Sequence, residues 1–323
     1  MGLFQTKFDY GTHETAVFKS DDVAEVENQK LECQKDHTKY IPVNELLLEK
    51  LPAGYRQQNL FDLIKCMAEL TVRITVKFCS AKRRQYWMGT EAEYPGYKDR
   101  GKESRLIGGG QICDVLKVEN GEIKCPCDHC KGANSEQRDV WNIHVFTATH
   151  VVYDSDEAEK SEIKLFYEGN NCIGNKTFYG VGTIWSNANG DLCVLSCVTC
   201  DQNLAASLVL TIKQINILWK SIRENYQNDK KDSKQRKYKD RIVVIVSHPH
   251  GGGKCVSFDN LDGRVWKWIY IDNRGWHLNY KASTCTGSSG APVYLYGMDW
   301  DKTAYAHSGC NGDCNYSTTW CPK

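Results

Sequence analysis

The sequence predicts an all-β protein with one inserted helix and a partly helical N-terminal extension. Short apolar runs of the β type recur along residues 71–323, and most are separated by Gly, Asn or Asp clusters, which is typical of strands joined by turns. Between them, apolar residues spaced by three and four from Leu204 to Tyr226 indicate a long helix with one buried face. We therefore expect an N-terminal extension over 1–70 and a β domain over 71–323, with the helix and a basic loop inserted at about 204–241.

The individual elements follow from local patterns. Residues 1–45 are polar and aperiodic, which predicts a loosely packed arm, and Asn59–Leu70 has the apolar spacing of a helix. Apolar residues then alternate strictly with polar ones up to Phe78, which predicts a half-buried strand. A basic run at Lys230–Arg241 follows the long helix and is interpreted as a solvated loop, with an acidic partner or anionic lipid surface as the alternative. Further strands are expected at Gln111–Val118, Trp141–Thr147, Ile163–Tyr167, Leu192–Ser196, Ile242–Ser247, Val265–Ile271 and Pro292–Tyr296.

Composition excludes several classes of protein. With a net charge of +1 over 323 residues, the chain lacks the basic excess of a dedicated nucleic-acid binder, and no nucleic-acid partner is expected. No stretch approaches the roughly 18 apolar residues of a membrane-spanning helix, and the N-terminus lacks the apolar core of a signal peptide. We expect a cytoplasmic protein whose 16 cysteines are reduced or metal-bound. Membrane association is expected only if Gly2, in a myristoylation-type start, is acylated.

Three short stretches contain the groups that acyl transfer requires. His150 follows the apolar run at Phe146, Asp191 opens an apolar run, and Ser289 lies in the glycine-rich turn Thr286–Pro292. Acyl transfer needs a nucleophile, a base that takes its proton, and an acid that orients the base. Glycines beside the serine allow a turn that aims two N–H groups at a developing oxyanion.

These stretches, in the order His, Asp, Ser, resemble the signature blocks of the chymotrypsin-like (trypsin-fold) serine proteases, of the single-chain intracellular type. The resemblance covers about residues 71–323 and implies two six-stranded antiparallel β-barrels with a catalytic triad between them. It implies that His150 is the general base, Asp191 its orienting acid and Ser289 the nucleophile, and that Gly287 and Ser289 supply the oxyanion-hole N–H groups. The implied function is a serine endopeptidase with a protein or peptide substrate and no cofactor in the chemistry. The alternative is a catalytically inactive trypsin-fold protein that binds peptides or serves as a scaffold.

One departure from the family concerns activation. Secreted members carry an aspartate immediately before the nucleophile, where it receives a new N-terminus after cleavage of the zymogen. This chain has Ser288 at that position and no matching start sequence. We therefore expect the site to be organised in another way, without the need for N-terminal clipping.

Substrate preference is expected to depend on two segments. Ser283 matches the base of the pocket, where trypsin has an aspartate, so a preference for Arg or Lys loses its counter-charge. The stretch that contains His307, Ser308 and Gly309 resembles the substrate-binding strand of glutamyl endopeptidases and picornavirus-type proteases. An imidazole can donate to a carboxylate or amide oxygen. We expect cleavage after Glu or Gln, and the competing expectation is a neutral pocket for small or aromatic residues.

A cysteine-rich turn predicts a structural zinc site. Cys125, Cys127 and Cys130 can converge on one tetrahedral Zn²⁺, and the alternatives are reduced thiols or a local disulfide. Chain geometry favours a fourth ligand from a neighbouring strand over one in the turn itself. The candidates for that ligand are Cys113, His129 and His144.

Two further features are interpreted without a catalytic role. The loop His248–Gly253 is read as a glycine-rich turn with solvent-facing histidines, in preference to a second metal or catalytic site. By resemblance, Cys285 and either Cys310 or Cys314 flank the pocket strands as the paired cysteines of secreted relatives do.

Overall fold

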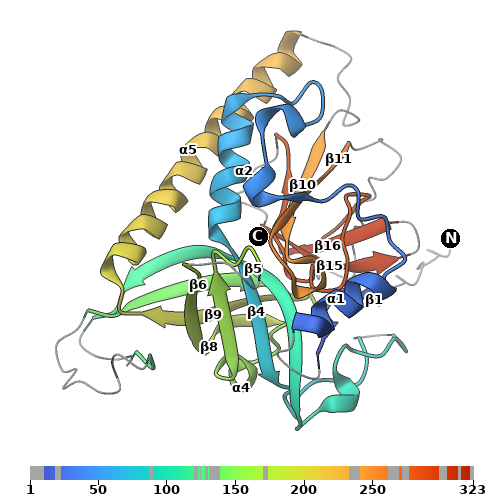
Figure 1. Cartoon of the computed structure of the whole chain (residues 1–323), viewed down its shortest axis with the longest axis vertical. Helices are drawn as coiled ribbons and strands as arrows, with labels where there is room; N and C mark the ends of the chain where they lie inside the picture. Colours follow the sequence, from blue (N-terminus) through green and yellow to red (C-terminus); the bar gives the residue numbers. More distant parts are fainter. Residues whose placement is uncertain are drawn as a thin grey trace, which may run out of the picture.

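The computed structural model describes residues 11–18, 23–87, 90–119, 123, 125–127, 130, 139–169, 174–232, 241–260, 269–270, 276–297, 304–311 and 314–320. Most of its regular structure is β-sheet, as predicted (Figure 1). The described helices are α1 (Val23–Glu32), α2 (Gln58–Leu70), α4 (Ser155–Ala158) and α5 (Gln202–Asp232), with single 3₁₀ turns η1 (Val43–Glu45), η2 (Leu48–Lys50), η3 (Tyr97–Asp99) and η5 (Pro249–Gly251).

Six antiparallel strands form a closed barrel. They follow one another around it in the order β5, β4, β7, β8, β9 and β6, and pairing between β5 and β6 completes the circle. The barrel strands are β4 (Thr71–Phe78), β5 (Glu103–Lys117), β6 (Trp141–Thr147), β7 (Ser161–Leu165), β8 (Lys176–Asn187) and β9 (Leu192–Thr199).

The apolar side chains of β4, the first barrel strand in the chain, face the core as the predicted alternation requires. Val72, Ile74 and Val76 on β4 are fully buried in the main core. The other face is covered as well, because the Arg73 guanidinium donates from Nε to the Gly251 carbonyl at 2.8 Å. The strand is therefore buried on both faces rather than half-buried, since the C-terminal half packs on its polar side.

The C-terminal half contains two further sheets. One has the order β1-β15-β16-β13-β12 and the other β14-β10-β11-β3, and the pairings of the described residues do not close either sheet into a second barrel. An isolated β-bridge between Pro292 and Ala306 links them. Their strands are β1 (Thr12–His13), β3 (Ile41–Pro42), β10 (Ile242–Ser247), β11 (Cys255–Asn260), β12 (Ile269–Tyr270), β13 (Trp276–Tyr280), β14 (Val293–Leu295), β15 (Ala304–Asn311) and β16 (Cys314–Trp320).

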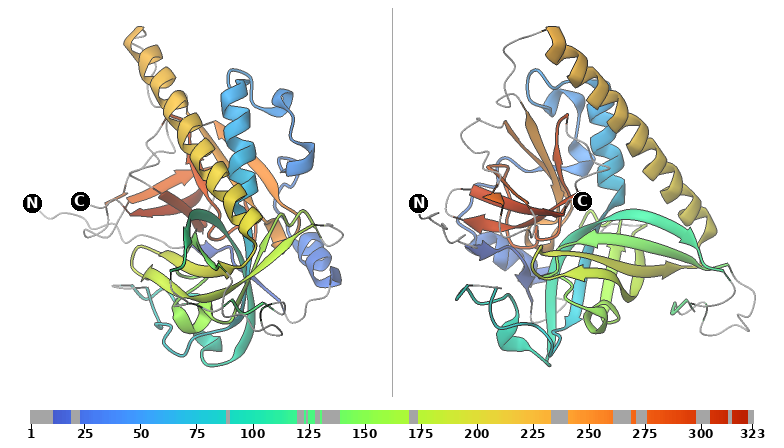
Figure 2. Two further views of the ribbon diagram at one scale, coloured as in Figure 1. Left: turned by 90° about the vertical axis from the view of Figure 1, so that its left-hand side faces the viewer. Right: turned by 180° about the vertical axis from the view of Figure 1, so that it is seen from behind.

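Helices α2 and α5 lie side by side across one flank of the molecule, as both figures of the whole chain show (Figures 1 and 2). The predicted apolar stripe of α5 enters the main core, where the Trp219 ring meets the Tyr294 ring edge-on at a centroid distance of 4.3 Å. Asp201 begins the helix by accepting a hydrogen bond from the Leu204 N–H at 3.0 Å. Residues 233–240 of the predicted basic loop lie outside the described residues. Within the part of the chain that is described, no helix combines the length and apolar character needed to cross a membrane.

The expected loosely packed arm is wrong for residues 12–18. Strand β1 pairs with β15, and β2 (Ala16–Val17) pairs with β5, so this segment touches both halves of the protein. Ala16 and Phe18 are buried against Ile107. Each strand has only two residues, which is too short for a periodic pattern to be seen in the sequence.

Candidate active site

Two turns of the barrel bring an imidazole and a carboxylate together. His150 lies just after β6, and its backbone N–H donates to Asp191 Oδ1 at 2.9 Å. Asp191 precedes β9 and has φ of 51°, in the left-handed region that non-glycine residues rarely adopt. The Thr149 hydroxyl donates to the Leu192 carbonyl at 2.6 Å and so joins the two turns. The barrel therefore fixes the relative position of both residues.

His150, Asp191 and Ser289 form one buried hydrogen-bonded chain. His150 Nδ1 lies 2.9 and 2.8 Å from the two Asp191 carboxylate oxygens, and His150 Nε2 lies 2.7 Å from Ser289 Oγ. The network assigns the proton to Nδ1, which leaves Nε2 to accept the serine proton. Burial by itself would raise the Asp191 pKa, but His150 and a 2.6 Å hydrogen bond from the Ser308 hydroxyl outweigh it, and the pKa is lowered.

The loop before Ser289 aims two N–H groups at a single oxygen. Gly287 N and Ser289 N donate to the Glu14 carbonyl oxygen at 2.5 and 3.3 Å. Gly287 has φ of 91°, and a Cβ there would lie 2.5 Å from the His248 carbonyl oxygen, so the turn requires glycine. The two predicted oxyanion donors therefore already hold a peptide carbonyl of the N-terminal segment.

Ser288 organises this loop through neutral hydrogen bonds. Its buried hydroxyl donates to Ser247 Oγ at 3.2 Å and accepts from the Cys285 N–H at 3.3 Å. These contacts tie the loop to the end of β10. They account for a loop held in place without a carboxylate at position 288.

An imidazole and an ammonium group bind the Glu14 side chain. His307 Nε2 lies 2.6 Å from Glu14 Oε2, and Lys35 Nζ contacts the other carboxylate oxygen while also donating to the Thr284 carbonyl at 3.1 Å. Burial would raise the Glu14 pKa, but the hydrogen bond from His307 and the charge of Lys35 lower it to about 2. The Tyr280 hydroxyl lies 2.6 Å from His307 Nδ1 and orients the ring. His307 was expected here, whereas Lys35 was not, because its proximity depends on a distant loop.

The residues next to Glu14 complete an extended backbone along the site. His13 pairs with Gly309 on β15, and its ring lies over His150 at a centroid distance of 4.6 Å. On the other side, Ala16 pairs with Ile107 on β5. A Cβ on Gly309 would lie 2.5 Å from the Thr12 carbonyl oxygen, so glycine permits the close approach of the two strands. Residues 12–17 therefore run through the site with strand pairing before and after Glu14.

The other residues predicted for the pocket have separate roles. Ser308 contacts Asp191 through its hydroxyl, and its carbonyl oxygen lies 3.1 Å from His13 Nδ1. Ser283 is half-buried, and its carbonyl oxygen accepts a hydrogen bond from the Ser257 hydroxyl at 2.8 Å. The described side-chain contacts of the Glu14 carboxylate are with His307 and Lys35.

A fully buried ion pair supports the backbone of His150. Arg83 Nε and Nη2 lie 2.6 and 2.7 Å from the Glu157 carboxylate oxygens, and Arg83 Nη1 donates to the His150 carbonyl at 2.9 Å. We expect Arg83→Met to lower the free energy of unfolding by about 3–5 kcal/mol, because Glu157 would keep a buried charge without its partner. Urea denaturation measures this change. Lys82→Met, which breaks an exposed pair next to it, is the control, and an equal loss for both variants would contradict the prediction.

Four thiols form a second candidate site, away from the triad. Cys125, Cys127, Cys130 and Cys200 have ligand atoms within 4.8 Å of one another, and Cys127 and Cys200 are 3.7 Å apart between sulfurs. The fourth member is thus Cys200, just after β9.

The candidates named for the fourth ligand need correction. Cys113 and His144 are not members of this group, and His129 lies outside the described residues. The Cys113 thiol instead donates to the His144 carbonyl at 3.5 Å. Cys113 and His144 come from the segments that flank the turn in the sequence, whereas Cys200 does not. Cys200 comes 70 positions after Cys130 and reaches the turn only because β9 pairs with β6.

The loop His248–Gly253 also differs from its interpretation as a solvent-facing turn. His248 is fully buried and His250 is 4% exposed. His250 N donates to the Thr286 carbonyl at 2.5 Å, directly before Gly287. The loop therefore packs against the turn that contains Gly287.

Comparison with known proteins adds no assignment to this geometry. A scan of the chain against protein-family models finds no match, and a search of the curated proteins finds none either.

Proposed function

We propose that the protein is a chymotrypsin-like serine endopeptidase that cleaves peptide bonds after glutamate. The single observation that supports this is that Ser289 belongs to two arrangements at once. Its hydroxyl lies 2.7 Å from His150 in a chain that ends at Asp191, and its N–H group donates, with that of Gly287, to the Glu14 carbonyl. The proposal includes the two-barrel fold of that family, with the strands of the C-terminal half making up the second barrel. The closed first barrel and the placement of the site between the two halves support it.

The side chains have distinct roles in the proposed reaction. Ser289 Oγ attacks the substrate carbonyl carbon while His150 Nε2 takes its proton, and Asp191 stabilises the resulting imidazolium. The N–H groups of Gly287 and Ser289 stabilise the oxyanion. His150 then protonates the leaving amine, and a water molecule hydrolyses the acyl-enzyme in the same way. No cofactor is needed for these steps.

Glutamate preference follows from the donors in the pocket. His307 and Lys35 both contact the Glu14 carboxylate, and charge-assisted hydrogen bonds of this kind are stronger than neutral ones. A glutamine side chain would offer one acceptor oxygen and turn its amide N–H₂ toward one of these donors. We therefore favour Glu over Gln, a choice that the sequence left open.

The alternative function is an inactive protein that binds peptides in the same groove. A fluorophosphonate probe distinguishes the two, because it labels only an activated serine. We expect labelling at Ser289 in the full chain and, more fully, in Glu14→Lys, where the new ammonium group opposes Lys35 and frees the groove. Ser289→Ala should abolish labelling, and Ser207→Ala, on the exposed face of α5, should leave it unchanged. Absence of labelling in both the wild type and folded Glu14→Lys would overturn the proposal.

The preference for Glu is expected to weaken in acid. The pocket lowers the carboxyl pKa from 4.5 to about 2, so it favours the ionised form. The binding free energy gained by the ionised carboxylate is fully present well above pH 4.5 and is lost as the pH falls toward 2. We expect the ratio of kcat/KM for matched Glu and Gln peptides to fall between pH 6 and pH 3, and taking the ratio cancels the titration of His150. A ratio that is constant over this range would show that the carboxylate is not recognised in its charged form.

We also propose that Cys125, Cys127, Cys130 and Cys200 bind a structural Zn²⁺. Their mutual distances suit a tetrahedral thiolate site, in which metal binding contributes folding energy. We expect Cys200→Ser to lose one equivalent of zinc by elemental analysis and to lower the Tm, whereas Cys113→Ser should change neither. Zinc content unchanged by Cys200→Ser would refute the ligand set.

A further inference from the structure

We propose that the chain cleaves itself between Glu14 and Thr15. This inference rests on the proposed function and adds a specific substrate, namely the N-terminal segment of the same chain. It starts from the observation that Gly287 N and Ser289 N both donate to the carbonyl oxygen of Glu14. This carbonyl belongs to the Glu14–Thr15 peptide bond, so it occupies the position in which the proposed reaction would stabilise the oxyanion.

The backbone on both sides of this bond is held as a substrate would be. Before it, Thr12 and His13 pair antiparallel with Cys310 and Gly309 on β15. After it, β2 pairs antiparallel with β5. An extended peptide fixed by strand pairing on both sides of the reacting carbonyl has the orientation that acyl transfer needs. Figure 1 shows β1 running beside β15 at this place.

Side chains of the segment fill matching sites. Glu14 is 3% exposed, and its carboxylate forms an ion pair with Lys35 and lies 2.6 Å from His307 Nε2. The His13 ring stacks on Trp87 at 5.1 Å on one side and lies over His150 on the other. A loose arm resting on the surface would not bury a glutamate against Lys35 and His307 or place a histidine ring between two aromatic rings. Both His13 and Glu14 therefore have specific side-chain partners in the site.

The reaction consumes one water molecule and no other reagent. Ser289 Oγ bonds to the Glu14 carbonyl carbon as His150 takes the hydroxyl proton. The bond to the Thr15 nitrogen then breaks as His150 returns that proton to it, which leaves Glu14 as an ester on Ser289 and a new amino terminus at Thr15. Water, deprotonated by His150, hydrolyses the ester, and the proton returns to Ser289 Oγ. The product fragment, residues 1–14, ends in a carboxylate.

Self-cleavage would change access to the site. Before the cut, residues 12–17 occupy the groove and compete with any other substrate. This argues against the expectation that activity needs no N-terminal clipping. After the cut, residues 1–14 are held only by non-covalent contacts and can exchange with another Glu-containing peptide.

Intact-mass measurement of the purified full chain tests the proposal. We expect wild type to lose residues 1–14 at neutral pH, with Thr15 as the new N-terminus and a rate that does not depend on protein concentration. Ser289→Ala should stay intact, Glu14→Gln should be cut at least tenfold more slowly, and the exposed Glu32→Gln should behave as wild type. The synthetic peptide of residues 11–17 is added to each protein as an external substrate.

Two negative results have different meanings. If wild type cuts the peptide or is labelled at Ser289 while its own Glu14–Thr15 bond stays intact, self-cleavage is refuted and the segment is an inhibitory strand. If the bond stays intact and neither cutting of the peptide nor labelling occurs, the proposed function itself fails.

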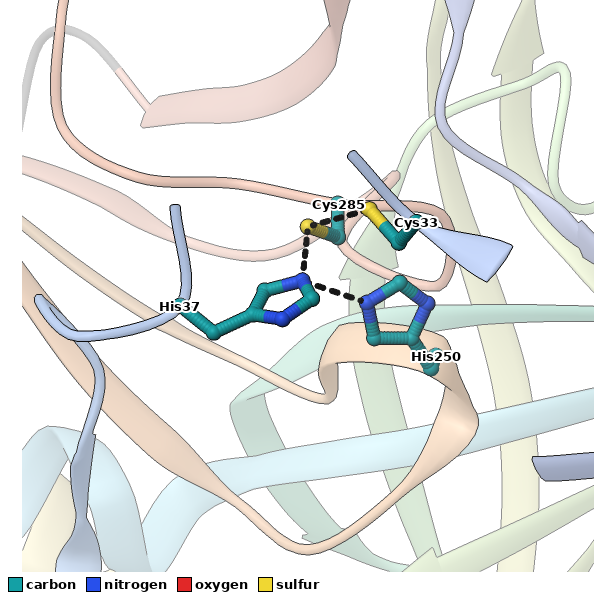
Figure 3. Close-up of side chains that lie close together, drawn as sticks. All are labelled: Cys33, His37, His250 and Cys285. Carbon is teal, nitrogen blue, oxygen red and sulfur yellow. Dashed lines mark hydrogen bonds between the residues drawn. The ribbon is translucent and has the colours of Figure 1, made fainter. Parts of the chain in front are cut away.

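A second inference comes from a different group of side chains and needs no catalytic activity. Cys33, His37, His250 and Cys285 converge from three parts of the chain, and Figure 3 shows their sulfur and nitrogen atoms directed at one another. Cys33 and Cys285 are 3.7 Å apart between sulfurs. His37 Nε2 lies 3.4 Å from Cys285 Sγ and 3.2 Å from His250 Nε2.

These three distances match the ligand–ligand distances of a tetrahedral zinc site. With Zn–S bonds of about 2.3 Å and Zn–N bonds of about 2.0–2.1 Å, two sulfurs lie about 3.8 Å apart, two nitrogens about 3.3 Å, and sulfur and nitrogen about 3.5 Å. A disulfide between Cys33 and Cys285 would require an S–S distance of about 2.0 Å. The pairing of Cys285 with Cys310 or Cys314 that the family resemblance suggested is not formed, because all three thiols are free in this structure.

The hydrogen bonding and the backbone conformation of His250 both suit a metal ligand. His250 Nδ1 lies 3.2 Å from the Thr286 hydroxyl oxygen, and a hydrogen bond there leaves Nε2 free for a metal. His250 has φ of 55°, a backbone conformation that places its ring beside His37 and that non-glycine residues rarely adopt. Two thiols and two imidazoles are the donor set that Zn²⁺ takes in structural sites.

We infer that Cys33, His37, His250 and Cys285 bind a second Zn²⁺. The metal would tie the segment after α1 to the loop that precedes Ser289. Lys35 lies between two of the ligands in the chain, so the site would also hold its ammonium group against the Glu14 carboxylate. The ion would act in positioning and would take no part in the bond-breaking steps.

Zinc stoichiometry of the full chain, purified without chelators, tests this inference. We expect two zinc equivalents in wild type, one in His37→Ala, one in Cys200→Ser and none in the double variant, with Cys255→Ser as the unchanged control. Co²⁺-substituted Cys200→Ser should show the visible absorption of a tetrahedral site with two thiolates. Equal zinc content in wild type and His37→Ala, or no thiolate-to-cobalt absorption, would overturn the assignment.

Discussion

Asp191→Asn is expected to lower kcat for a Glu-containing peptide about 10⁴-fold, with the fold unchanged. Asp191 accepts from both the backbone N–H and the Nδ1–H of His150. A carboxamide presents an N–H₂ group to one of these donors and so favours the tautomer with the proton on Nε2, which cannot accept the Ser289 proton. It also cannot stabilise the imidazolium formed on attack. Steady-state kinetics at neutral pH measure the effect.

The chain provides a matched control for this variant. Asp114 Oδ2 lies 3.9 Å from His144 Nδ1, which makes a second His–Asp contact outside the site. The Asp114 side chain is exposed. Asp114→Asn should leave kcat within about twofold. A loss of less than tenfold for Asp191→Asn would mean that this carboxylate does not orient the base, and the triad assignment would then be wrong.

His307→Ala is the second variant with a large expected effect. It removes a 2.6 Å hydrogen bond to a buried carboxylate, and loss of one partner of such a pair costs about 2–5 kcal/mol. We expect kcat/KM for Glu peptides to fall between about 30-fold and several thousand-fold, whereas that for matched Ala or Leu peptides should change less than about tenfold. Peptide-library profiling before and after the substitution measures both classes of substrate.

Two further variants, Lys35→Met and His144→Ala, test whether the effect is specific to His307. Lys35→Met should reduce the same Glu preference by a smaller factor, because Lys35 is 42% exposed and its charge is partly screened by solvent. His144→Ala, at a half-buried histidine outside the pocket, should leave the preference unchanged. Identical profiles for His307→Ala and wild type would remove His307 from the pocket and, with it, the proposed preference for glutamate.

The sequence indicated the three groups of the proposed triad because each lies in a short segment with its own local signal. His150 and Asp191 adjoin apolar strands that were visible as runs of β-type residues, and Ser289 lies among glycines that only a special turn requires. The barrel strand β6 and strand β10 have the predicted bounds for the same reason. His307 was recognisable from the residues that follow it. These features depend on neighbours in the chain, which a sequence displays directly.

Other features arise from contacts between segments far apart in the chain. Cys200 joins Cys130 through strand pairing, and Lys35 reaches Glu14 through a loop. The role of Glu14 had no local signal, because its two flanking strands are each two residues long and take their partners from β15 and β5.

The sequence by itself determined the β-rich class, the long helix and the three groups of the proposed chemistry, since alternation, helical spacing and turn residues act over a few positions. Only the tertiary structure decided which cysteines share a site and what lies in the groove. Such contacts come from burial and strand pairing between distant segments. The free energy of those contacts depends on the whole fold and leaves no periodic pattern in the chain.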